Sequence, residues 1–297
     1  NKLFLMKKIY IVLPTYNDWK SLEKVLEILN LRLKNLKKDI YILIINDCSK
    51  EKFKKTKNFK NFKKIIVLNL KKNLGSQKAI YVGLKYLQKK IKDYNNAIIS
   101  ILDSDGEDDP KALKKLIQIT ERKKDFFIFA SRKGRTENRF LKILNKARLY
   151  ITLILTGKFI NFGNFSSFPS SLLKRITLND DIFLAFSSGV AKNYSKLFLY
   201  NVKKNKRFYD TSKVNIKFLI IHSIKIISVF YKIVFLRTFL IMSFLLLISK
   251  NNFYSSYIII FTFLLINILL FLISWFGKPK KEVSNFIKNI SSIKIAS

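Results

Sequence analysis

The chain has 297 residues and a formal charge of +38, from 57 lysines and arginines against 19 aspartates and glutamates. This length accommodates one catalytic domain and a smaller accessory region. The basic excess predicts a polyanionic partner such as nucleic acid, an anionic lipid surface or a phosphate-bearing substrate, and a compositional bias toward lysine is the alternative explanation. Because Cys48 is the only cysteine and His222 the only histidine, disulfide frameworks, Cys/His zinc sites and Ser-His-Asp or Cys-His catalysis are excluded within one chain.

Short apolar runs alternate with amphipathic stretches over residues 9–130, which is typical of strand-helix units that build a mostly parallel sheet. The clearest helix carries leucines and a valine on one face over residues 22–36. Pro110 follows Asp109 as a first-turn proline follows an N-cap, which predicts a helix running to about Arg122. Strands are predicted at 9–13, 40–45, 65–70, 97–102 and 126–130.

The pattern changes after about residue 216. Residues 216–232 place lysines on one helical face and apolar residues elsewhere, which predicts an amphipathic helix in a membrane interface; a buried core helix is the alternative. The apolar runs 233–249 and 257–276 are long enough to form a transmembrane helical hairpin over residues 233–277. Lysines follow the second run directly, so both ends of the hairpin are expected in the cytoplasm, with 278–297 as a basic cytoplasmic tail.

A cluster of carboxylates directly follows the fourth predicted strand, in the segment Asp-Ser-Asp-Gly-Glu-Asp-Asp-Pro at 103–110. This is where an open α/β sheet binds its ligand. Alternation along the chain points Asp103, Asp105 and Glu107 the same way. Mg²⁺ or Mn²⁺ prefers such oxygen ligands and is commonly shared with substrate phosphates. An ordinary Asp-rich turn is the alternative interpretation.

Other strand ends are polar as well. Strand one ends in Pro-Thr-Tyr-Asn-Asp at 14–18, strand two ends in Asn-Asp-Cys-Ser at 46–49, and Asn-Leu-Gly-Ser-Gln-Lys-Ala follows at 73–79. Each segment alone is compatible with a turn or a helix cap. Together with the acidic segment they indicate a nucleotide pocket at one edge of the sheet.

These motifs resemble the family 2 nucleotide-sugar glycosyltransferases of GT-A fold, and 103–110 is similar to the Asp-x-Asp-Gly-Glu-Asp-x-Pro variant of polyprenyl-phosphate glycosyltransferases related to dolichol-phosphate mannose synthase. The resemblance covers about 9–237 and implies an α/β GT-A catalytic domain over 1–215. It implies donor-binding residues at Pro14, Tyr16, Asp18, Asp47, Lys78, Asp103 and Arg132. Metal ligands are expected at Asp103, Asp105 and Glu107, and catalytic carboxylates at Asp103, Asp105 and Asp108.

Further similarity lies downstream. Ala-Ser-Arg at 130–132 resembles the family's Gly-x-Arg, and Phe-Gly-Asn-Phe-Ser at 162–166 resembles its Gly-Asp-Phe-Arg motif on the acceptor side. The segment 207–213 resembles its Arg-x-x-Gly-x-Ser-Lys motif. This implies that Arg207, Ser212 and Lys213 bind the acceptor phosphate next to the membrane.

The chain departs from the family pattern at Asp18 for Glu, Asn46 for Asp, Cys48 for Gly, Asn164 for Asp and Asp210 for Gly. The changes at Cys48 and Asp210 remove glycines that could supply a positive φ. Asn164 cannot accept a proton as a carboxylate would. A phosphate monoester already carries its nucleophilic oxyanion at neutral pH, so transfer to a lipid phosphate needs positioned cations rather than a strong base. The candidate cations are Arg132, Arg135, Arg139, Arg207 and Lys213.

The expected activity is therefore an inverting transfer of a hexose from a nucleotide-diphosphate sugar to a polyprenyl phosphate or other lipid-linked acceptor. The expected place is the cytoplasmic leaflet of the inner membrane, with a multi-pass chain that serves cell-envelope biogenesis. One alternative acceptor is a sugar hydroxyl of a polysaccharide or lipopolysaccharide precursor, with Asp108 or Asp109 as base. Another alternative is an inactive glycosyltransferase-like membrane scaffold.

Nucleic acid is not expected as a partner, because the basic residues are spread along the chain and no recognition motif occurs. The first eight residues are too short for a secretory signal, which agrees with a cytoplasmic catalytic domain. The sequence leaves open which nucleotide and sugar are used, which acceptor is used, and the oligomeric state, a homo-oligomer included.

Overall fold

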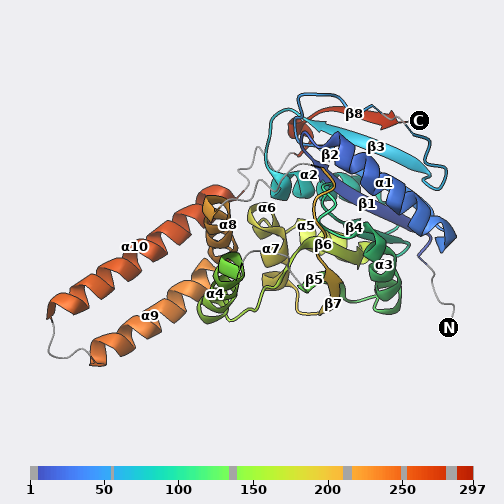
Figure 1. Ribbon diagram of the computed structural model, residues 1–297. Coiled ribbons are helices and arrows are strands. Elements are labelled where there is room, and N and C mark those ends of the chain that lie inside the picture. Colours follow the sequence, from blue (N-terminus) through green and yellow to red (C-terminus); the bar gives the residue numbers. More distant parts are fainter. Residues whose placement is uncertain are drawn as a thin grey trace.

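A computed structural model describes residues 6–54, 57–133, 139–209, 216–248, 253–278 and 286–296. Figure 1 shows an α/β domain from which two long helices project side by side. Over the described residues, one eight-stranded sheet has the order β7-β5-β6-β4-β1-β2-β3-β8. The α/β class and the mostly parallel sheet expected from the sequence are confirmed.

The middle of the sheet consists of parallel neighbours in the order β4-β1-β2-β3. These strands are β1 (Lys8–Thr15), β2 (Asp39–Asn46), β3 (Lys64–Leu70) and β4 (Ala97–Ile101). Each lies within two residues of its predicted position. Because parallel strands end at the same edge, the polar segments that follow β1, β2, β3 and β4 meet there.

The remaining strands of the catalytic half extend the sheet beyond β4. The strand β5 (Phe127–Lys133) was predicted, whereas β6 (Phe162–Pro169) and β7 (Leu197–Lys203) were not. The strand β6 runs antiparallel to both β4 and β5, and β7 is parallel to β5. The antiparallel β6 carries residue 164 to the side of the acidic segment after β4.

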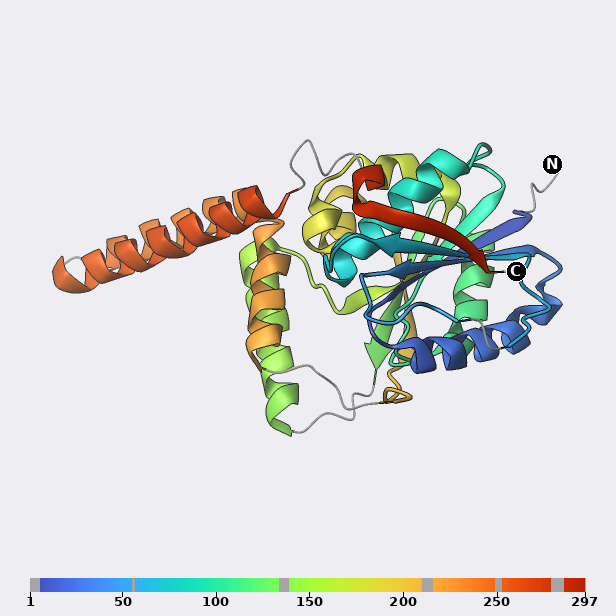
Figure 2. The same cartoon turned by 90° about the horizontal axis from the view of Figure 1, so that it is seen from above.

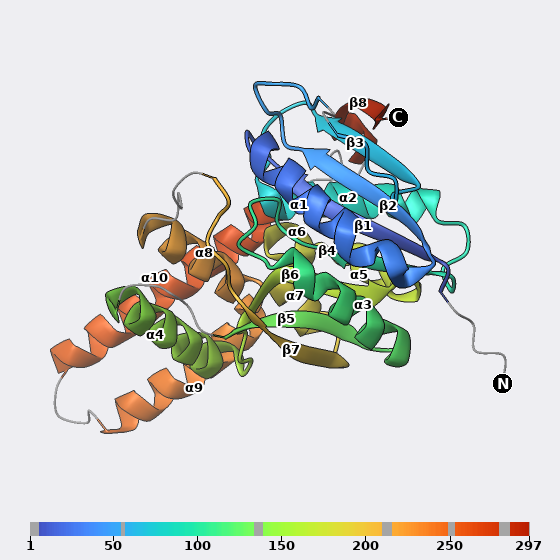
Figure 3. The same ribbon diagram turned by 45° about the vertical axis from the view of Figure 1, so that its right-hand side comes forward.

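Helices cover both faces of the sheet. In Figure 3, α1 (Trp19–Leu33) and α3 (Leu113–Arg122) lie on one face. The apolar side of α1, from Leu22 to Leu33, is buried against the odd-numbered residues of β1, as its periodicity predicts. The Asp109 side chain accepts a hydrogen bond from the Lys111 amide, 3.1 Å away, so the predicted cap before Pro110 is present.

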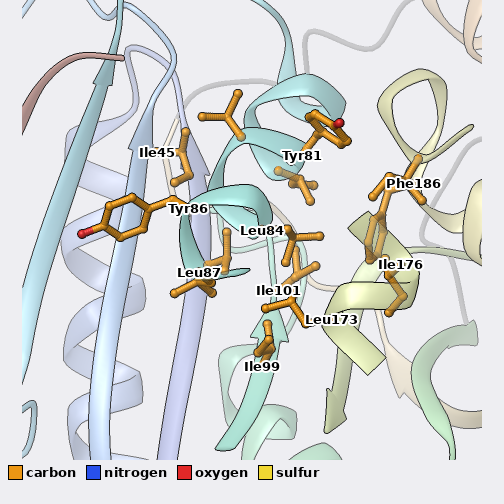
Figure 4. Packing of buried hydrophobic residues seen from close by; sticks show 14 of the residues in the cluster. Ile45, Tyr81, Leu84, Tyr86, Leu87, Ile99, Ile101, Leu173, Ile176 and Phe186 are labelled. Carbon is orange, nitrogen blue, oxygen red and sulfur yellow. The ribbon is translucent and has the colours of Figure 1, made fainter. Parts of the chain in front are cut away.

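The opposite face is covered by α2 (Ser76–Lys90), whose Leu84 and Leu87 lie in one buried cluster with Ile45 of β2 and Ile101 of β4 (Figure 4). Tyr81 of α2 points away from these strands, and its ring centre lies 5.2 Å from that of Phe183. Each fully buried side chain of this size stabilises the fold by about 2 kcal/mol. The short helices of the domain are η1 (Lys34–Leu36), η2 (Pro110–Ala112), η3 (Ser170–Leu172), α5 (Leu173–Thr177), α6 (Asp181–Leu184) and α7 (Phe186–Asn193).

The projecting helices are α9 (Tyr231–Ile248) and α10 (Phe253–Gly277), and α8 (Ile216–Ser228) precedes them. The apolar segments Tyr231–Ile248 and Tyr254–Gly277 have mean hydropathies of 2.0 and 2.7, and only 11% of each is buried, so neither resembles the buried core helix of a soluble domain. Both are long and apolar enough to cross a membrane. The helix α9 starts at Tyr231, two residues before the predicted first span, and α8 ends at Ser228 rather than at residue 232.

The helix α4 (Arg139–Thr156) was not predicted. It lies beside α8 and α9 in Figure 2 rather than over the sheet. Arg237 of α9 donates a hydrogen bond to the Ile154 carbonyl, 2.9 Å away, which joins the two helices. The apolar residues Ile143, Tyr150 and Ile154 of α4 are about 60% exposed. A large apolar surface therefore continues from the projecting helices onto the catalytic domain.

The segment assigned to a basic tail also contains regular structure, which the sequence analysis did not predict. After η4 (Phe286–Asn289), β8 (Ile290–Ala296) pairs antiparallel with β3 at the edge of the sheet (Figure 1). The Asn69 amide donates to the Ser292 hydroxyl at 2.9 Å. The irregular spacing of isoleucines in β8 gives no clear period-two signal, so its pairing depends on β3. One sheet thus contains chain from before and after the helical pair.

Pairing of β8 with β3 predicts a specific disulfide. In a Cys48→Ser background, Asn69→Cys with Ser292→Cys should cross-link on mild oxidation, because the two positions are paired in register. Electrophoresis under non-reducing conditions, after cleavage between the two positions, measures the cross-link. The control pair Asn69→Cys with Ile293→Cys should remain unlinked, because adjacent residues of a strand point to opposite faces. Equal cross-linking of both pairs would contradict the observed register.

Candidate functional site

The acidic segment after β4 forms a tight turn stabilised by its own carboxylates. The Asp105 side chain accepts a hydrogen bond from the Glu107 amide at 2.9 Å, and the Asp108 side chain accepts one from the Asp103 amide at 3.3 Å. Gly106 has a φ of +85°, a conformation that favours glycine. The sequence correctly placed this turn at the end of a buried strand, beside the end of β1.

A second segment, 204–208, lies directly on this turn, and this contact was not predicted from the sequence. The amides of Phe208 and Asn205 donate to the carbonyls of Asp105 and Glu107 at 3.1 and 3.0 Å. The Phe208 ring lies where a side chain at Gly106 would have to be, with 2.4 Å to an ideal Cβ. The glycine is therefore required twice, for its backbone angle and for this close approach.

Arg207 connects the acidic turn to the end of β1. Its guanidinium donates to the Asp18 carboxylate at 2.6 Å, and its Nε lies 3.8 Å from the Asp105 carboxylate. The Arg207 side chain is only 17% exposed, and its Nε has no hydrogen-bond partner. Asp18 occupies the N-cap position of α1 but makes no capping bond, because its carboxylate is used by Arg207. An N-cap residue whose side chain binds a distant partner instead of its own helix indicates a functional position.

Burial of this cluster changes the proton affinity of its central carboxylate. Burial raises the pKa of Asp105 from 3.8 to about 6, and the charges of Glu107 and Asp108 add to the rise. The Glu107 amide and the Arg207 guanidinium oppose the rise. Perturbed carboxylates of this kind are typical of functional sites.

The residues present fit a divalent metal only if a ligand supplies further oxygens. Within the described ranges, no group of three or more His, Cys, Asp or Glu residues could hold a metal. Glu107, predicted as a third ligand, forms an ion pair with Lys204 at 2.7 Å. Mg²⁺ and Mn²⁺ are often held by one or two carboxylates plus substrate phosphates, which Asp103 and Asp105 can provide together with a diphosphate. The Arg207 cation beside Asp105 shows that this position accommodates positive charge.

Hydrogen bonds connect the turn after β2 to the end of β3 and to the loop that follows β3. Both carboxylate oxygens of Asp47 accept backbone amides, from Leu74 at 2.7 Å and Gly75 at 2.8 Å, and burial raises the pKa of Asp47. The Asn46 amide donates to the Asn69 side chain at 2.8 Å, which an ionised aspartate could not do. The change to asparagine at Asn46 therefore has a structural reason. A contact of Asp47 with the nucleoside stays a prediction.

Cys48 keeps the left-handed conformation that the family's glycine would supply. Its φ is +62°, and it is exposed. The turn therefore keeps a left-handed residue without glycine, because the cysteine itself adopts this strained region. The other glycine replacement, Asp210, lies outside the described residues.

The remaining predicted residues are placed as follows. The Pro14 carbonyl accepts a hydrogen bond from the Ser104 hydroxyl at 2.9 Å, Tyr16 is 46% exposed, and the Lys78 ammonium lies 5.0 Å from the centre of the Phe183 ring. Burial lowers the pKa of Lys78, and the nearby cations Lys225 and Lys72 add to this effect. Arg132 is on β5 and Arg139 begins α4, but their side chains lie outside the description, as do Arg135, Ser212 and Lys213 altogether.

Asn164 on β6 lies beside the acidic turn, as the resemblance implies. Its side-chain amide donates to the Asp103 carboxylate at 3.3 Å and its oxygen accepts from the Gln77 amide at 3.0 Å. Gln77, like Lys204 and Phe208, was not singled out in the sequence. A glutamine in the first turn of a helix carries no signal that it contacts a strand 87 residues away.

Comparison with known proteins gives a family and a fold. The family model described as glycosyl transferase family 2 matches residues 10–181, which is more than half of the chain. Among solved structures, mannosyl-3-phosphoglycerate synthase from Rubrobacter xylanophilus aligns with a TM-score of 0.51 at 12% identity, over 75% of this chain and 72% of that one. At this identity the likeness concerns the fold alone.

Two curated relatives match the catalytic half. An uncharacterized glycosyltransferase from Synechocystis sp. is 30% identical over 142 residues, which are 47% of this chain and 42% of that protein. The undecaprenyl-phosphate 4-deoxy-4-formamido-L-arabinose transferase of Photorhabdus laumondii is 26% identical over 146 residues, which are 48% of this chain and 42% of that protein. The chain thus spans about two fifths of the length of the curated relatives it matches.

Replacing Cys48 by glycine should stabilise the protein. A side chain in the left-handed region costs roughly 1–2 kcal/mol, whereas glycine costs roughly 0.5–1 kcal/mol through the entropy of the unfolded chain. Cys48→Gly is therefore expected to raise the free energy of unfolding by about 0.5–1 kcal/mol, measured as a higher Tm. Cys48→Ala keeps the Cβ atom and should give no such gain. A gain of equal size in both variants would mean that the thiol, not the backbone angle, is responsible.

The raised pKa of Asp105 predicts a pH-dependent stability. The folded state binds this proton more tightly than the unfolded state, so Asp105 lowers the stability of the metal-free protein as pH rises from about 4 through 6. Asp105→Asn should therefore raise Tm at pH 7.5, and this advantage should shrink as pH falls through 6. The control Asp125→Asn changes a carboxylate that is 74% exposed and should give no such trend. A constant difference between wild type and Asp105→Asn from pH 5 to 8 would contradict the raised pKa.

Proposed function

Because this chain belongs to glycosyl transferase family 2, we propose that it transfers a hexose from a nucleotide-diphosphate sugar to a polyprenyl phosphate at the cytoplasmic face of a membrane. It is a glycosyltransferase of GT-A fold that uses a nucleotide sugar; the hexose, the lipid acceptor and the membrane orientation are the proposal. One observation carries it. Arg207 contacts both Asp18 and Asp105, and it lies within ten residues of the start of α8, which the apolar helices α9 and α10 follow.

The donor is assigned to the edge where β4, β1 and β2 end. Asp103 and Asp105 would hold a divalent metal together with the donor diphosphate, while Asp18 and Asp47 lie at the strand ends expected to contact the nucleoside. When bound, the metal would neutralise the negative charge that develops on the departing nucleoside diphosphate. Arg207 is a fixed cation in a mostly buried position beside this edge, where its charge acts more strongly than it would in water, and its binding of the acceptor phosphate stays a prediction.

The acceptor is argued from the bases that the site offers. In the transfer, an acceptor oxygen forms a bond to the anomeric carbon while the bond from that carbon to the donor phosphate breaks, which inverts the configuration. Asn164 is an amide and cannot take a proton from a sugar hydroxyl, and one carboxylate oxygen of Asp108 and one of Asp109 already accept backbone amides. A phosphate acceptor brings an oxyanion of its own. These contacts favour a phosphate acceptor over the sugar-hydroxyl alternative.

A lipid source for that phosphate is supported by the apolar surface. The helices α9 and α10 have the length and hydropathy of membrane spans, and α4 adds exposed apolar residues beside them. Because β8 pairs with β3, the chain that leaves the catalytic sheet returns to it, which agrees with a hairpin that crosses twice. Lysine-rich flanks favour a cytoplasmic position for both ends. One relative at 26% identity is named for a transfer to undecaprenyl phosphate.

An inactive scaffold is the remaining alternative. The contacts among Asp18, Asp105 and Arg207 argue against it, because such a cluster of buried charges is costly to maintain without a function. Metal-dependent hydrolysis of a donor by the purified protein would separate an enzyme from a scaffold.

The transfer itself can be measured with detergent-solubilised protein, a panel of nucleotide sugars and a polyprenyl phosphate, with and without Mn²⁺. We expect a lipid-linked sugar that forms only with the metal. Asp105→Asn should reduce its rate on the order of 10²–10⁴-fold, because the leaving diphosphate loses part of its charge compensation. The exposed control Asp125→Asn should retain the wild-type rate.

Each other outcome removes a part of the proposal. A water-soluble product made from a sugar acceptor would replace the lipid phosphate by a hydroxyl acceptor. Full turnover in excess EDTA would remove the metal assignment. Absence of both transfer and hydrolysis with every donor would leave the scaffold.

A further inference from the structure

Three hydrogen bonds connect the start of α7 to the acidic turn through two side-chain amides. The Phe186 amide donates to Gln77 Oε1 at 2.7 Å, Gln77 Nε2 donates to Asn164 Oδ1 at 3.0 Å, and Asn164 Nδ2 donates to Asp103 Oδ1 at 3.3 Å. The partners come from α2, β6 and the turn after β4. In this relay of three hydrogen bonds, Phe186 and Asn164 are buried, whereas Gln77 and Asp103 are partly exposed.

The relay can run in one direction only. A backbone N–H can only donate, so the Gln77 atom that faces Phe186 must be the oxygen. The other end of the Gln77 amide is then its NH₂ group, which can only donate, so Asn164 must turn its oxygen toward Gln77. Asn164 is left with its NH₂ group facing Asp103. Each amide orientation therefore follows from chemistry, starting from the fixed backbone donor.

The start of the relay satisfies a requirement of its own. Phe186 is the first residue of α7, where backbone amides lack partners within the helix. Ala185 stands at the N-cap position and has no side-chain acceptor. Gln77 of α2 supplies the missing cap from another helix. The hydrogen bond from the Phe186 amide therefore fixes the orientation of the Gln77 side-chain amide.

We propose that Gln77 and Asn164 are positioning residues that aim an amide donor at Asp103 and so fix the orientation of its carboxylate as a metal ligand. The proposal rests on the proposed function, in which Asp103 and Asp105 hold the metal and the donor diphosphate. It also gives the asparagine at Asn164 a role: it is the terminal donor of the relay, which an ionised aspartate could not be. Partners behind a metal ligand commonly change metal affinity or activity by 10–100-fold when they are removed.

The variant Gln77→Glu reverses the relay with almost no change in shape. Its carboxylate still accepts the Phe186 amide, and a negative charge suits a helix N-terminus, so the fold is expected to hold. The carboxylate cannot donate to Asn164, whose amide then turns its NH₂ group toward Glu and its oxygen toward Asp103. We expect Mn²⁺ affinity, measured by electron paramagnetic resonance with UDP or GDP present, to fall about tenfold or more. The rate of sugar transfer should fall with it.

The direction of the change in Mn²⁺ affinity of Gln77→Glu distinguishes the relay from simpler explanations. An added negative charge near a cation site should by itself tighten Mn²⁺ binding, and a pure capping role for Gln77 should leave it unchanged. The matched control Gln88→Glu makes the same charge change at the far end of α2 and should not weaken binding. In an Asp103→Asn background, Gln77→Glu should have no further effect, because the relay then ends on a residue that no longer carries the ligand charge.

A second variant protects the test against misfolding. Asn164→Ala removes the last step but leaves the Gln77 cap on α7, and it should also weaken Mn²⁺ binding. Unchanged or tighter Mn²⁺ binding in both variants, with wild-type transfer intact, would overturn the relay and leave the proposed function standing. If the wild-type protein shows no metal-dependent binding of either nucleotide and no transfer, the proposed function fails and the relay fails with it.

Discussion

The site depends on an ion pair between Arg207 and Asp18, because this contact joins segments that are 189 residues apart in the chain. Asp18 ends the β1 loop, and Arg207 also approaches Asp105 after β4. The carboxylates of Asp18 and Asp105, from neighbouring strand ends, would repel each other in this mostly buried place without a cation. Removing one partner of a buried pair typically costs on the order of 3–5 kcal/mol. The segment 204–208 is thereby held on the acidic turn, and the chain leaves it toward α8.

The parallel strands and their polar ends could be predicted because their signals are local. A buried parallel strand is a short apolar run, and the acidic turn, the cap at Asp109 and the amphipathic α1 each follow from a few adjacent residues. The left-handed position at Cys48 was also inferable, since the resemblance placed a glycine there. Resemblance and local pattern together located the edge where the site lies.

The features that escaped prediction all depend on partners far away in the chain. Gln77 gains its role only from Phe186 and Asn164, and Phe208 only from the space above Gly106. The helix α4 has a mixed apolar and basic sequence that does not tell whether it covers a sheet or lies beside α9. The strand β8 needs the free edge of β3 as a template. Distances between side chains such as Glu107 and Lys204 likewise decide which carboxylates remain for a metal.

The position of β8 has a consequence for how the protein is made. Until residues 290–296 leave the ribosome, β3 has an unpaired edge, and such edges are prone to pair with other chains. The sheet can be completed only after α9 and α10 have been synthesised, and in the membrane hairpin proposed above, insertion of only one of the two helices would carry β8 to the side of the membrane opposite β3. Correct membrane integration and a protected catalytic sheet are then the same event. A molecule that inserts wrongly would expose β3 and become a target for chaperones and proteases.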